Sequence, residues 1–347
     1  MTPRPSQILE YEPLSKYCTL EIGGPARYLL KAQRRSEIIE AVQWARAHQI
    51  PWVMIGRGSN TLFDDRGFVG LVIVPRLAER EFAPMSHSVS GKTSFLLSGA
   101  FSLPQLAATA SRKGYSGLEF ACGIPGSLAG AVYMNAGAHG GSMSFLVERV
   151  DFLDENNQLR TLPGDLLEFG YRKSVFQKKN WVILSVQLGL ELDSSGSSRE
   201  KLFAFAKQRR ETQPQHCRSA GCFFRNPEQS SRALVTSKKP LSAGALIDKA
   251  GLKGLSLGKV QISAAHANFL VHLKGTPLDR ENKQQQGVLL KYGLTEQELM
   301  MCKKLGPGAQ MRKLIALVRN IVKTKYLYNL ETEVRYLPFE GPSFQMI

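Results

Sequence analysis

The chain has 347 residues, of which 43% are apolar and 21% charged, a composition typical of a soluble globular protein with two or three domains. Its five cysteines lack CxxC spacing, which argues against a disulfide framework and a zinc site; they are Cys18, Cys122, Cys217, Cys222 and Cys302. The formal charge of +16 favours anionic partners, either a nucleotide ligand or nucleic acid, although a generally basic surface explains it equally well.

The sequence contains no signal for secretion or membrane insertion. The first residues include no apolar segment of the kind found in a signal peptide, and no stretch approaches the roughly 20 apolar residues of a membrane span. The basic residues are dispersed, and no common nucleic-acid-binding motif is present. We therefore expect a cytoplasmic protein with no membrane partner and no nucleic-acid partner.

The first predicted elements are a helix, a strand and a glycine-containing loop. Ser36 is expected to cap a helix in which Ile38, Val42 and Ala45 recur at helical spacing. Pro51 interrupts this pattern, and residues 52–55 form a buried apolar strand. The loop that follows consists of Gly56, Arg57, Gly58, Ser59 and Asn60, and residues 68–74 form a second strand.

This first loop contains the components of a phosphate cradle. Its two glycines permit close backbone approach, so that successive N–H groups can converge on a diphosphate while Ser59 and Asn60 add further donors. It matches neither the GxGxxG dinucleotide motif nor the P-loop, which requires a lysine. A simple turn between two strands is an equally good interpretation of the loop alone.

The rest of the chain alternates between helices and strands. A helix is predicted over 103–112, closed by Gly114, and a glycine- and alanine-rich stretch covers 123–142. Further helices are predicted over 199–210, 242–250 and 311–323, with strands over 150–153, 181–190, 266–273 and 333–337. Gln213-Pro214 is a plausible domain boundary.

A second glycine loop opens the glycine- and alanine-rich stretch. It consists of Gly123, Ile124, Pro125, Gly126 and Ser127, and residues 126–141 hold five glycines. Such a scarcity of bulky side chains suggests backbone lying against a flat ligand. A tightly packed helix–turn element is the alternative.

Several motifs occur in the order found in one enzyme family. They cover residues 19–26, 56–60, 117–127, 135–140, 171–174, 219–227, 265–269 and 330–335. Through these motifs, nearly the whole chain resembles the UDP-N-acetylenolpyruvoylglucosamine reductase (MurB) family. Only 45 residues separate Ser174 from Ser219, which is similar to the shorter subtype without a tyrosine-bearing substrate-capping loop.

The resemblance implies an α+β fold with a two-part FAD-binding domain of the PCMH type and a C-terminal α+β substrate-binding domain. We expect the first FAD-binding part over 1–75 together with the strand at 327–347, and the second over 76–213. The substrate-binding domain then covers 214–326. Within it, residues 277–310 do not match the family, and we interpret them as a surface insertion.

The implied activity is NADPH-dependent, FAD-mediated reduction of UDP-N-acetylglucosamine enolpyruvate to UDP-N-acetylmuramate in peptidoglycan precursor synthesis. The cofactors would be FAD and NADPH, with the FAD diphosphate held by the two glycine loops. Reduction of an enolpyruvyl ether requires a hydride at C3 and a proton at C2. It also requires fixed cationic or hydrogen-bonding groups for the charge that develops on the substrate.

By resemblance, Arg172 and Glu333 polarise the substrate carboxylate and stabilise the enol-like intermediate. An arginine suits this role because its planar fork pairs with a carboxylate and stays charged. Glu333 would act best in its protonated form, beside an anionic substrate. From the residues alone, a surface salt bridge for Arg172 and an edge-strand carboxylate for Glu333 remain the alternatives.

Cys222 stands where the family commonly carries a serine that donates the proton. A thiol, whose pKa in water is near ~8.5, is a competent acid at neutral pH and is also small. The alternative is a buried structural cysteine.

Two further residues resemble substrate contacts. Asn226 lies in the turn that matches the family's diphosphate contact, and Thr212 stands where the family often has a lysine, so Arg210 is the expected substitute. His266 and Asn268 are expected to orient local backbone.

Two other functions compete with this interpretation. One is a flavin oxidase of the same broader fold, although no histidine or cysteine for tethering FAD lies between Gly56 and Gly70. The other is a basic nucleic-acid-binding protein without catalysis.

Overall fold

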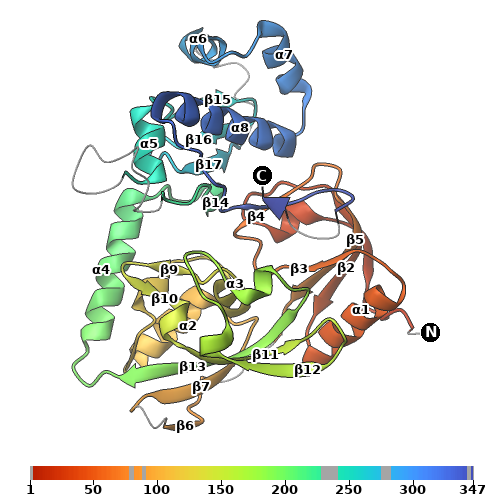
Figure 1. Ribbon diagram of the computed structural model, residues 1–347, viewed down its shortest axis with the longest axis vertical. Coiled ribbons are helices and arrows are strands. Elements are labelled where there is room, and N and C mark those ends of the chain that lie inside the picture. The colour runs from red at the N-terminus through yellow and green to blue at the C-terminus, as the bar shows by residue number, and fades with distance from the viewer. Residues whose placement is uncertain are drawn as a thin grey trace. The chain divides into compact units, whose positions relative to one another are not determined.

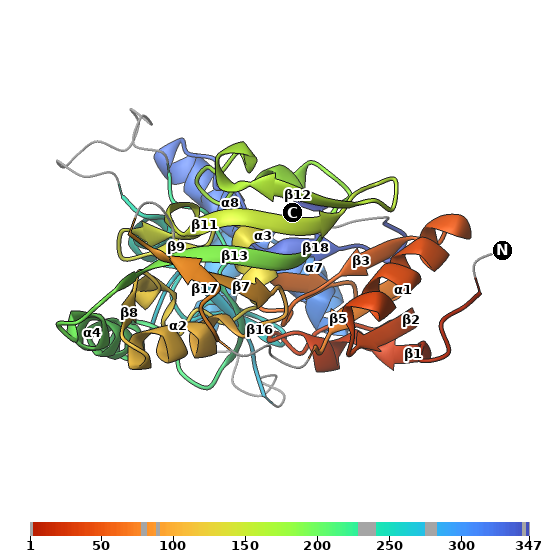
Figure 2. The same ribbon diagram turned by 90° about the horizontal axis from the view of Figure 1, so that it is seen from below.

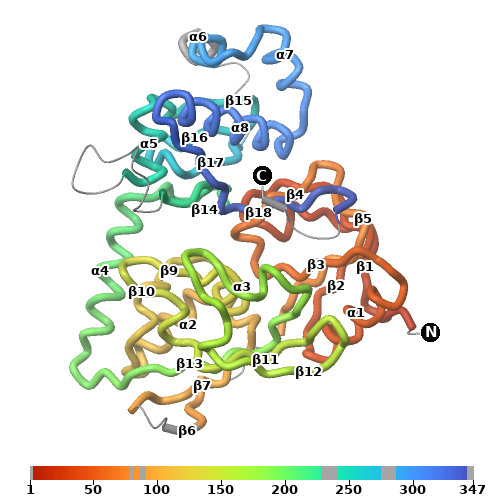
Figure 3. The backbone as a smooth tube through the Cα atoms, viewed as in Figure 1, coloured from red at the N-terminus to blue at the C-terminus, as the bar shows by residue number. Residues whose placement is uncertain are grey.

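The protein divides into two compact units, here described from a computed structural model (Figures 1 and 3). The structure describes residues 3–77, 82–87, 91–227, 241–274, 283–341 and 345–346. The first unit comprises Met1–Glu10, Tyr28–Arg57 and Leu71–Glu211, and the second comprises Tyr11–Arg27, Gly58–Gly70 and Thr212–Ile347. The three-part division expected from the sequence stays a prediction.

A four-stranded sheet with the order β1-β2-β5-β3 forms near the N-terminus. Its strands are β1 (Leu9–Pro13), β2 (Pro25–Ala32), β5 (Phe68–Pro75) and β3 (Trp52–Met54). Helix α1 (Arg35–Ala47) packs its apolar face on this sheet, where Ile38 and Val42 join the core of Leu30 and Ile73 (Figures 1 and 2). The apolar residues that recur at helical spacing in the sequence are thus the ones that the helix buries against the sheet.

The expected capping of α1 by Ser36 is wrong. The helix begins at Arg35 with Arg34 as the N-cap residue. The carboxylate of Glu37 accepts the backbone N–H groups of Gln33 at 2.7 Å and Arg34 at 3.3 Å. Because the helix begins at Arg35, Ser36 lies inside its first turn and cannot be the N-cap residue.

The large sheet of the first unit has the order β12-β11-β13-β7-β6, and β8 pairs with β13. The strands are β6 (Ser86–His87), β7 (Thr93–Ser98), β8 (Tyr115–Ser116), β11 (Val147–Leu153), β12 (Leu159–Pro163) and β13 (Val182–Leu192). Helices α2 (Leu103–Arg112) and α3 (Leu128–Tyr133) share one hydrophobic core with the strands of this sheet. The prediction of α2 is confirmed at both ends, and Gly114 follows it with φ +79°.

Short elements complete the first unit. They are η2 (Glu119–Ala121), β9 (Gly137–Ala138), β10 (Gly141–Ser142), η3 (Met143–Phe145), η4 (Gly164–Leu166), η5 (Val175–Gln177) and most of α4 (Ser197–Thr212). Strands β9 and β10 pair in an antiparallel ladder, so the glycine- and alanine-rich stretch forms a small hairpin after α3.

The second unit contains two sheets. In the first, β14 (Arg218–Cys222), β17 (Phe269–His272), β16 (Val260–Ile262) and β15 (Ser256–Leu257) form antiparallel neighbours. In the other, β18 (Arg335–Leu337) runs parallel to β4 (Thr61–Phe63) and pairs on its other side with β19 (Gln345–Met346). The unit also holds η1 (Leu14–Tyr17), α5 (Ala243–Lys249) and α8 (Pro307–Tyr326).

The segment predicted as an insertion, 277–310, is helical where it is described; residues 275–282 lie outside the described part. It forms α6 (Lys283–Lys291), α7 (Glu296–Lys304) and the first turn of α8. Thr295 caps α7 together with Glu298, and Cys302 is fully buried. Gln310 is also buried, where its amide accepts the N–H of Lys259 and donates to the carbonyl of Cys302. The end of this segment is therefore built into the core of the second unit.

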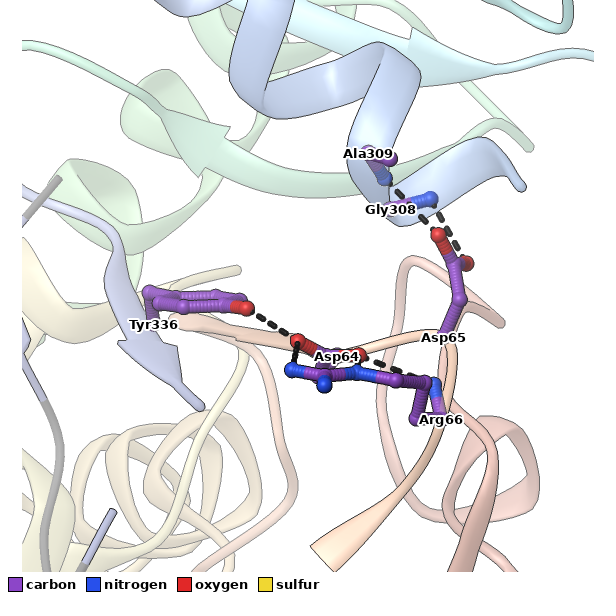
Figure 4. A network of polar contacts seen from close by, with 6 residues as sticks. All are labelled: Asp64, Asp65, Arg66, Gly308, Ala309 and Tyr336. Carbon is purple, nitrogen blue, oxygen red and sulfur yellow. Dashed lines mark hydrogen bonds and ion pairs between the residues drawn. The ribbon is translucent and has the colours of Figure 1, made fainter. Parts of the chain in front are cut away.

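A polar network holds the start of α8 and the strand β18 to the residues after β4 (Figure 4). The carboxylate of Asp65 accepts the N–H groups of Gly308 and Ala309, both at 2.8 Å, and so caps the helix. The neighbouring carboxylate of Asp64 accepts hydrogen bonds from the Arg66 guanidinium and the Tyr336 hydroxyl. Two adjacent aspartates thus fix two elements from the end of the chain.

The Asp64 contacts predict a loss of stability in acid. Burial raises the pKa of Asp64, but the hydrogen bonds from Arg66 and Tyr336 outweigh it and lower that pKa from 3.8 to about 2. Because the native pKa is depressed, the stabilisation is complete above about pH 4 and is lost as the pH falls towards about 2. We expect urea unfolding to show a loss of about 2 kcal/mol over this range that Asp64→Asn lacks. A wild-type acid dependence unchanged in Asp64→Asn would contradict this assignment.

Candidate functional site

The first glycine loop follows β3 and contacts the second glycine loop. The N–H of Ile55 donates to Ile73 at 2.9 Å, which holds the start of the loop on strand β5. A Cβ atom at Gly56 would lie 2.3 Å from the Oγ of Ser127. Two segments about 70 residues apart in the chain therefore touch, and they touch only because residue 56 lacks a side chain.

The remainder of the first loop is held within the second unit. Gly58 has φ +61°, and a Cβ there would lie 2.1 Å from the carbonyl oxygen of Tyr17. The N–H of Thr19 donates to the Gly58 carbonyl at 3.2 Å. Ser59 is half-buried, whereas Arg57 is exposed to solvent. The backbone after Gly56 is thus set by a segment that the sequence also singled out, residues 19–26.

The second glycine loop leads directly into helix α3. Gly123 and Gly126 have φ +69° and +155°, and the Gly126 carbonyl accepts the N–H of Leu103 at 3.0 Å. Ser127 is buried and caps α3 by accepting the N–H of Gly130 at 3.2 Å. Between Gly123 and Gly126, Ile124 packs against the core and Pro125 is exposed. The loop is therefore anchored at its end and exposed at Gly123.

Helix α4 lies over this exposed part of the loop, a feature that the sequence analysis missed. Leu202 packs against the core, and Phe205 stacks on the ring of His139 at 4.0 Å between centroids. Arg209 donates from Nη2 to the carbonyl of Gly123 at 3.1 Å. These three residues share a face at helical i,i+3 and i,i+4 spacing, a signal that was present in the sequence.

Arg210, the expected substrate contact, lies beside Arg209 and is exposed. Both arginines act on the nearby Cys122 thiol. Burial raises the pKa of Cys122, and the positive charges of Arg209 and Arg210 oppose that rise. The structure thus places a cationic helix end beside the second loop, with Arg209 as the member in direct contact.

Arg172 occupies a two-residue turn. Gly170 and Lys173 exchange two backbone hydrogen bonds of 3.1 Å, which leaves Tyr171 and Arg172 at the tip. Arg172 has φ +56°, and its Nη2 donates to the carbonyl of Gly137 at 3.1 Å. The guanidinium also lies over the Tyr171 ring, 5.1 Å from its centroid. A bidentate cation is thus held on an exposed turn beside the β9–β10 hairpin.

Cys222 lies at the end of β14, where it pairs with Phe269 across a bulge in the ladder with β17. Gly221, with φ +80°, forms this irregularity. The next two residues are fixed by Asn268, whose backbone oxygen accepts the Phe223 N–H and whose side chain exchanges two hydrogen bonds with Phe224. The thiol is therefore partly exposed on a rigid strand end, and the expected backbone role of Asn268 is confirmed.

Glu333 lies next to this strand end. Its N–H donates to the carbonyl of Phe223 at 2.7 Å, and its carbonyl accepts Nδ2 of Asn60 at 3.1 Å. Glu333 is half-buried, and the residues on either side of it in the sequence, Thr332 and Val334, are buried. Glu331, two residues earlier, is 71% exposed and pairs with Arg225 at 3.7 Å. Within the second unit, Cys222, Glu333 and Asn60 are thus brought into one neighbourhood.

Asn226, which the resemblance predicts as a substrate contact, makes a structural hydrogen bond. Its Oδ1 accepts the N–H of Ala243 at 3.0 Å, at the start of α5. The turn at 225–227 is therefore anchored to a helix of the second unit.

Over the described ranges, no group of three or more His, Cys, Asp and Glu side chains could hold a metal ion. Within those same ranges, no helix is both long and apolar enough to span a bilayer.

Comparison with known proteins gives consistent matches. A model of the UDP-N-acetylenolpyruvoylglucosamine reductase C-terminal domain matches residues 213–279, and an FAD-binding domain model matches residues 26–162. A UDP-N-acetylenolpyruvoylglucosamine reductase of Chlamydia trachomatis serovar D is 42% identical over 268 residues, covering 77% of this chain and 85% of the relative. One of Chlamydia abortus is 38% identical over 329 residues, covering 95% and 94%.

A solved structure agrees with these matches. The enzyme of the same name from Thermus caldophilus has a TM-score of 0.67 and 30% sequence identity, covering 95% of this chain and 98% of that chain. Together with the two domain matches, this confirms the expected α+β fold with a PCMH-type FAD-binding domain and a distinct C-terminal domain.

Proposed function

This chain belongs to the UDP-N-acetylenolpyruvoylglucosamine reductase family, and from that premise we propose that it reduces UDP-N-acetylglucosamine enolpyruvate to UDP-N-acetylmuramate with NADPH as the electron donor. The observation that carries the proposal is the presence, on the end of β14 and beside β18, of Cys222 and Glu333 at the family's motif positions. The product would enter peptidoglycan precursor synthesis, in support of cell shape and division. We propose a cytoplasmic enzyme.

The two glycine loops fit FAD. Gly58, Gly123 and Gly126 have positive φ angles, so backbone N–H groups in each loop can turn towards a diphosphate. Gly56 lets the two loops touch at Ser127. We propose that Gly56, Arg57, Gly58, Ser59 and Asn60 hold the cofactor together with the residues of the second loop, which are Gly123, Ile124, Pro125, Gly126 and Ser127.

Substitution of Gly56 tests the contact between the loops. Gly56→Ala is expected to weaken FAD binding by about tenfold, because the new Cβ would lie 2.3 Å from the Ser127 Oγ. In Gly56→Ala/Ser127→Ala the nearest side-chain atom is the residue-127 Cβ at 3.2 Å, so affinity should partly recover. Titration of the apoprotein with FAD, followed by flavin fluorescence, measures Gly56→Ala, Ser127→Ala and the double variant. Strictly additive losses in the double variant would show that the two loops do not act on one another.

The protein side chains supply binding, charge stabilisation and the proton. FAD, when bound, supplies the hydride that reaches C3 of the enolpyruvyl group after reduction by NADPH. We propose that Arg172 binds the substrate carboxylate through its guanidinium, which stays charged and suits a bidentate contact. Glu333 stabilises the enol-like form, and the Cys222 Sγ donates the proton to C2. Asn226 and Arg210 are proposed as substrate contacts, with Arg209 as an additional cation beside the second loop.

The visible spectrum of the purified protein tests this function. NADPH added without oxygen should bleach a yellow flavin, and UDP-N-acetylglucosamine enolpyruvate should then restore the colour. A flavin that recovers only when oxygen is admitted would indicate the alternative, an FAD-dependent oxidase. A colourless protein that binds duplex DNA in a salt-dependent manner would instead favour the nucleic-acid-binding alternative.

A further inference from the structure

The backbone of Arg172 has a conformation that the local sequence does not favour. Its φ of +56° lies in the left-handed region, where the Cβ of a bulky residue approaches the following carbonyl oxygen. Such a residue persists in that region only when its surroundings hold it there. The contacts of the turn at residues 170–173 therefore determine where the guanidinium is presented.

Gln177 contacts the carbonyl of Arg172. From its half-buried position at the end of η5, its Nε2 donates to the carbonyl oxygen of Arg172 at 3.0 Å and to that of Tyr133 at 2.8 Å. A glutamine amide has two N–H donors on that nitrogen, so both contacts are satisfied at once. One side chain thus ties the arginine turn to the last residue of α3.

Two further side chains hold the same turn to the end of α3 and to the segment that follows it. Asn135 donates from Nδ2 to the Gly170 carbonyl at 2.9 Å and accepts the Ser144 N–H at 3.0 Å. Ser174 donates from Oγ to the Tyr133 carbonyl at 2.8 Å. Both Asn135 and Ser174 are buried. Breaking these hydrogen bonds would leave buried polar groups without partners, which costs free energy.

Helix α3, with the segment that follows it, is therefore a shared support. Its first turn is capped by Ser127 of the second glycine loop, and the carbonyl of its last residue, Tyr133, accepts hydrogen bonds from both Gln177 and Ser174. The arginine turn and the proposed cofactor loop are attached to opposite ends of one six-residue helix. A displacement of the turn relative to that helix would move the guanidinium relative to the proposed flavin site.

We propose that Gln177 is a positioning residue for Arg172, acting through the Arg172 carbonyl to hold the guanidinium where it can bind the substrate carboxylate. The inference rests on the proposed function, in which Arg172 binds that carboxylate. Gln177 acts on the turn through the Arg172 carbonyl, and Asn135 supports the same turn through the Gly170 carbonyl.

The test replaces Gln177 by methionine in the FAD-loaded enzyme. Methionine has a similar length but no N–H donor, so both carbonyl contacts are lost. We expect kcat/KM for UDP-N-acetylglucosamine enolpyruvate to fall by about 10-fold to 100-fold, since a small misplacement of a positioning group has effects of that size. The rate of flavin reduction by NADPH should stay at the wild-type value.

Gln187→Met is the matched control. Gln187 lies on β13 in the same unit, and its amide donates to Glu148 at 2.6 Å, away from the arginine turn. The same chemical change at this position should leave both half-reactions unchanged. Equal losses in Gln187→Met and Gln177→Met would show a general effect of removing an amide and would overturn the inference.

A double-variant cycle separates positioning from general structural support. If Gln177 acts through Arg172, then Gln177→Met should cause no further loss in an Arg172→Ala background. A full additional loss in that background would overturn the inference while leaving the proposed function intact, as would wild-type activity in Gln177→Met. A wild-type protein that binds FAD but does not reduce the enolpyruvyl substrate would overturn the proposed function and this inference with it.

Discussion

Cys222→Ala is expected to lower kcat for reduction of UDP-N-acetylglucosamine enolpyruvate by about 100-fold or more, whereas Cys222→Ser retains activity. Loss of a positioned proton donor has an effect of that order. Serine keeps a small protic side chain at the end of β14, where the bulge at Gly221 and the contacts of Asn268 fix the backbone. Steady-state turnover and the rate of flavin reoxidation by the substrate measure the effect.

Cys217→Ala provides the matched control for this result. Cys217 precedes β14 and is exposed. In the described part of the chain, its thiol makes one hydrogen bond, donated to the carbonyl of Pro214 at 3.7 Å. Its replacement should leave turnover unchanged. Wild-type activity in Cys222→Ala would remove the thiol from the proton-transfer step and make it a structural residue.

Glu333→Gln is expected to lower kcat by about 100-fold while flavin reduction by NADPH proceeds at its normal rate. The variant keeps the shape of the side chain, and the backbone bonds of residue 333 to Phe223 and Asn60 do not involve it. What changes is the acidity of the group that faces the developing charge on the substrate. Stopped-flow measurement of the two half-reactions separates these steps.

Glu331→Gln is the natural comparison, because period-2 alternation would place this residue, two positions earlier, on the same face as Glu333. Its side chain is 71% exposed, and its carboxylate pairs at 3.7 Å with Arg225, whose own side chain is 12% exposed. Little change is expected in this variant. If Glu331→Gln lost activity and Glu333→Gln did not, the motif alignment that selected Glu333 would be wrong.

The sequence could predict most elements and the family. Helical spacing and turn residues located α2, α4, α5 and α8, because these signals come from neighbouring residues and depend little on the rest of the chain. Conversely, the sequence missed the caps of α1 and α8. Helix α1 begins before Ser36, and Glu37 accepts the N–H group of Gln33 ahead of it. Helix α8 is capped by Asp65, which lies 243 residues from Gly308 in the chain.

The choice between neighbouring candidates needed the tertiary structure. Glu331 and Glu333 have the same strand periodicity, and only the pairing of their strand with the Phe223 segment leaves one exposed and the other half-buried. In the same way, Arg209 rather than Arg210 reaches Gly123, because the face of α4 is set by Phe205 packing on His139.

By itself, then, the sequence determined which residue types and turns this protein has and, through their order, to which family it belongs. Only the tertiary structure decided that Gly56 meets Ser127 and that Gln177 holds the carbonyl of Arg172. Local propensities act over a few residues, whereas these contacts join segments whose approach depends on burial of the whole core. A side chain that contacts a residue of another segment produces no periodic pattern in the sequence.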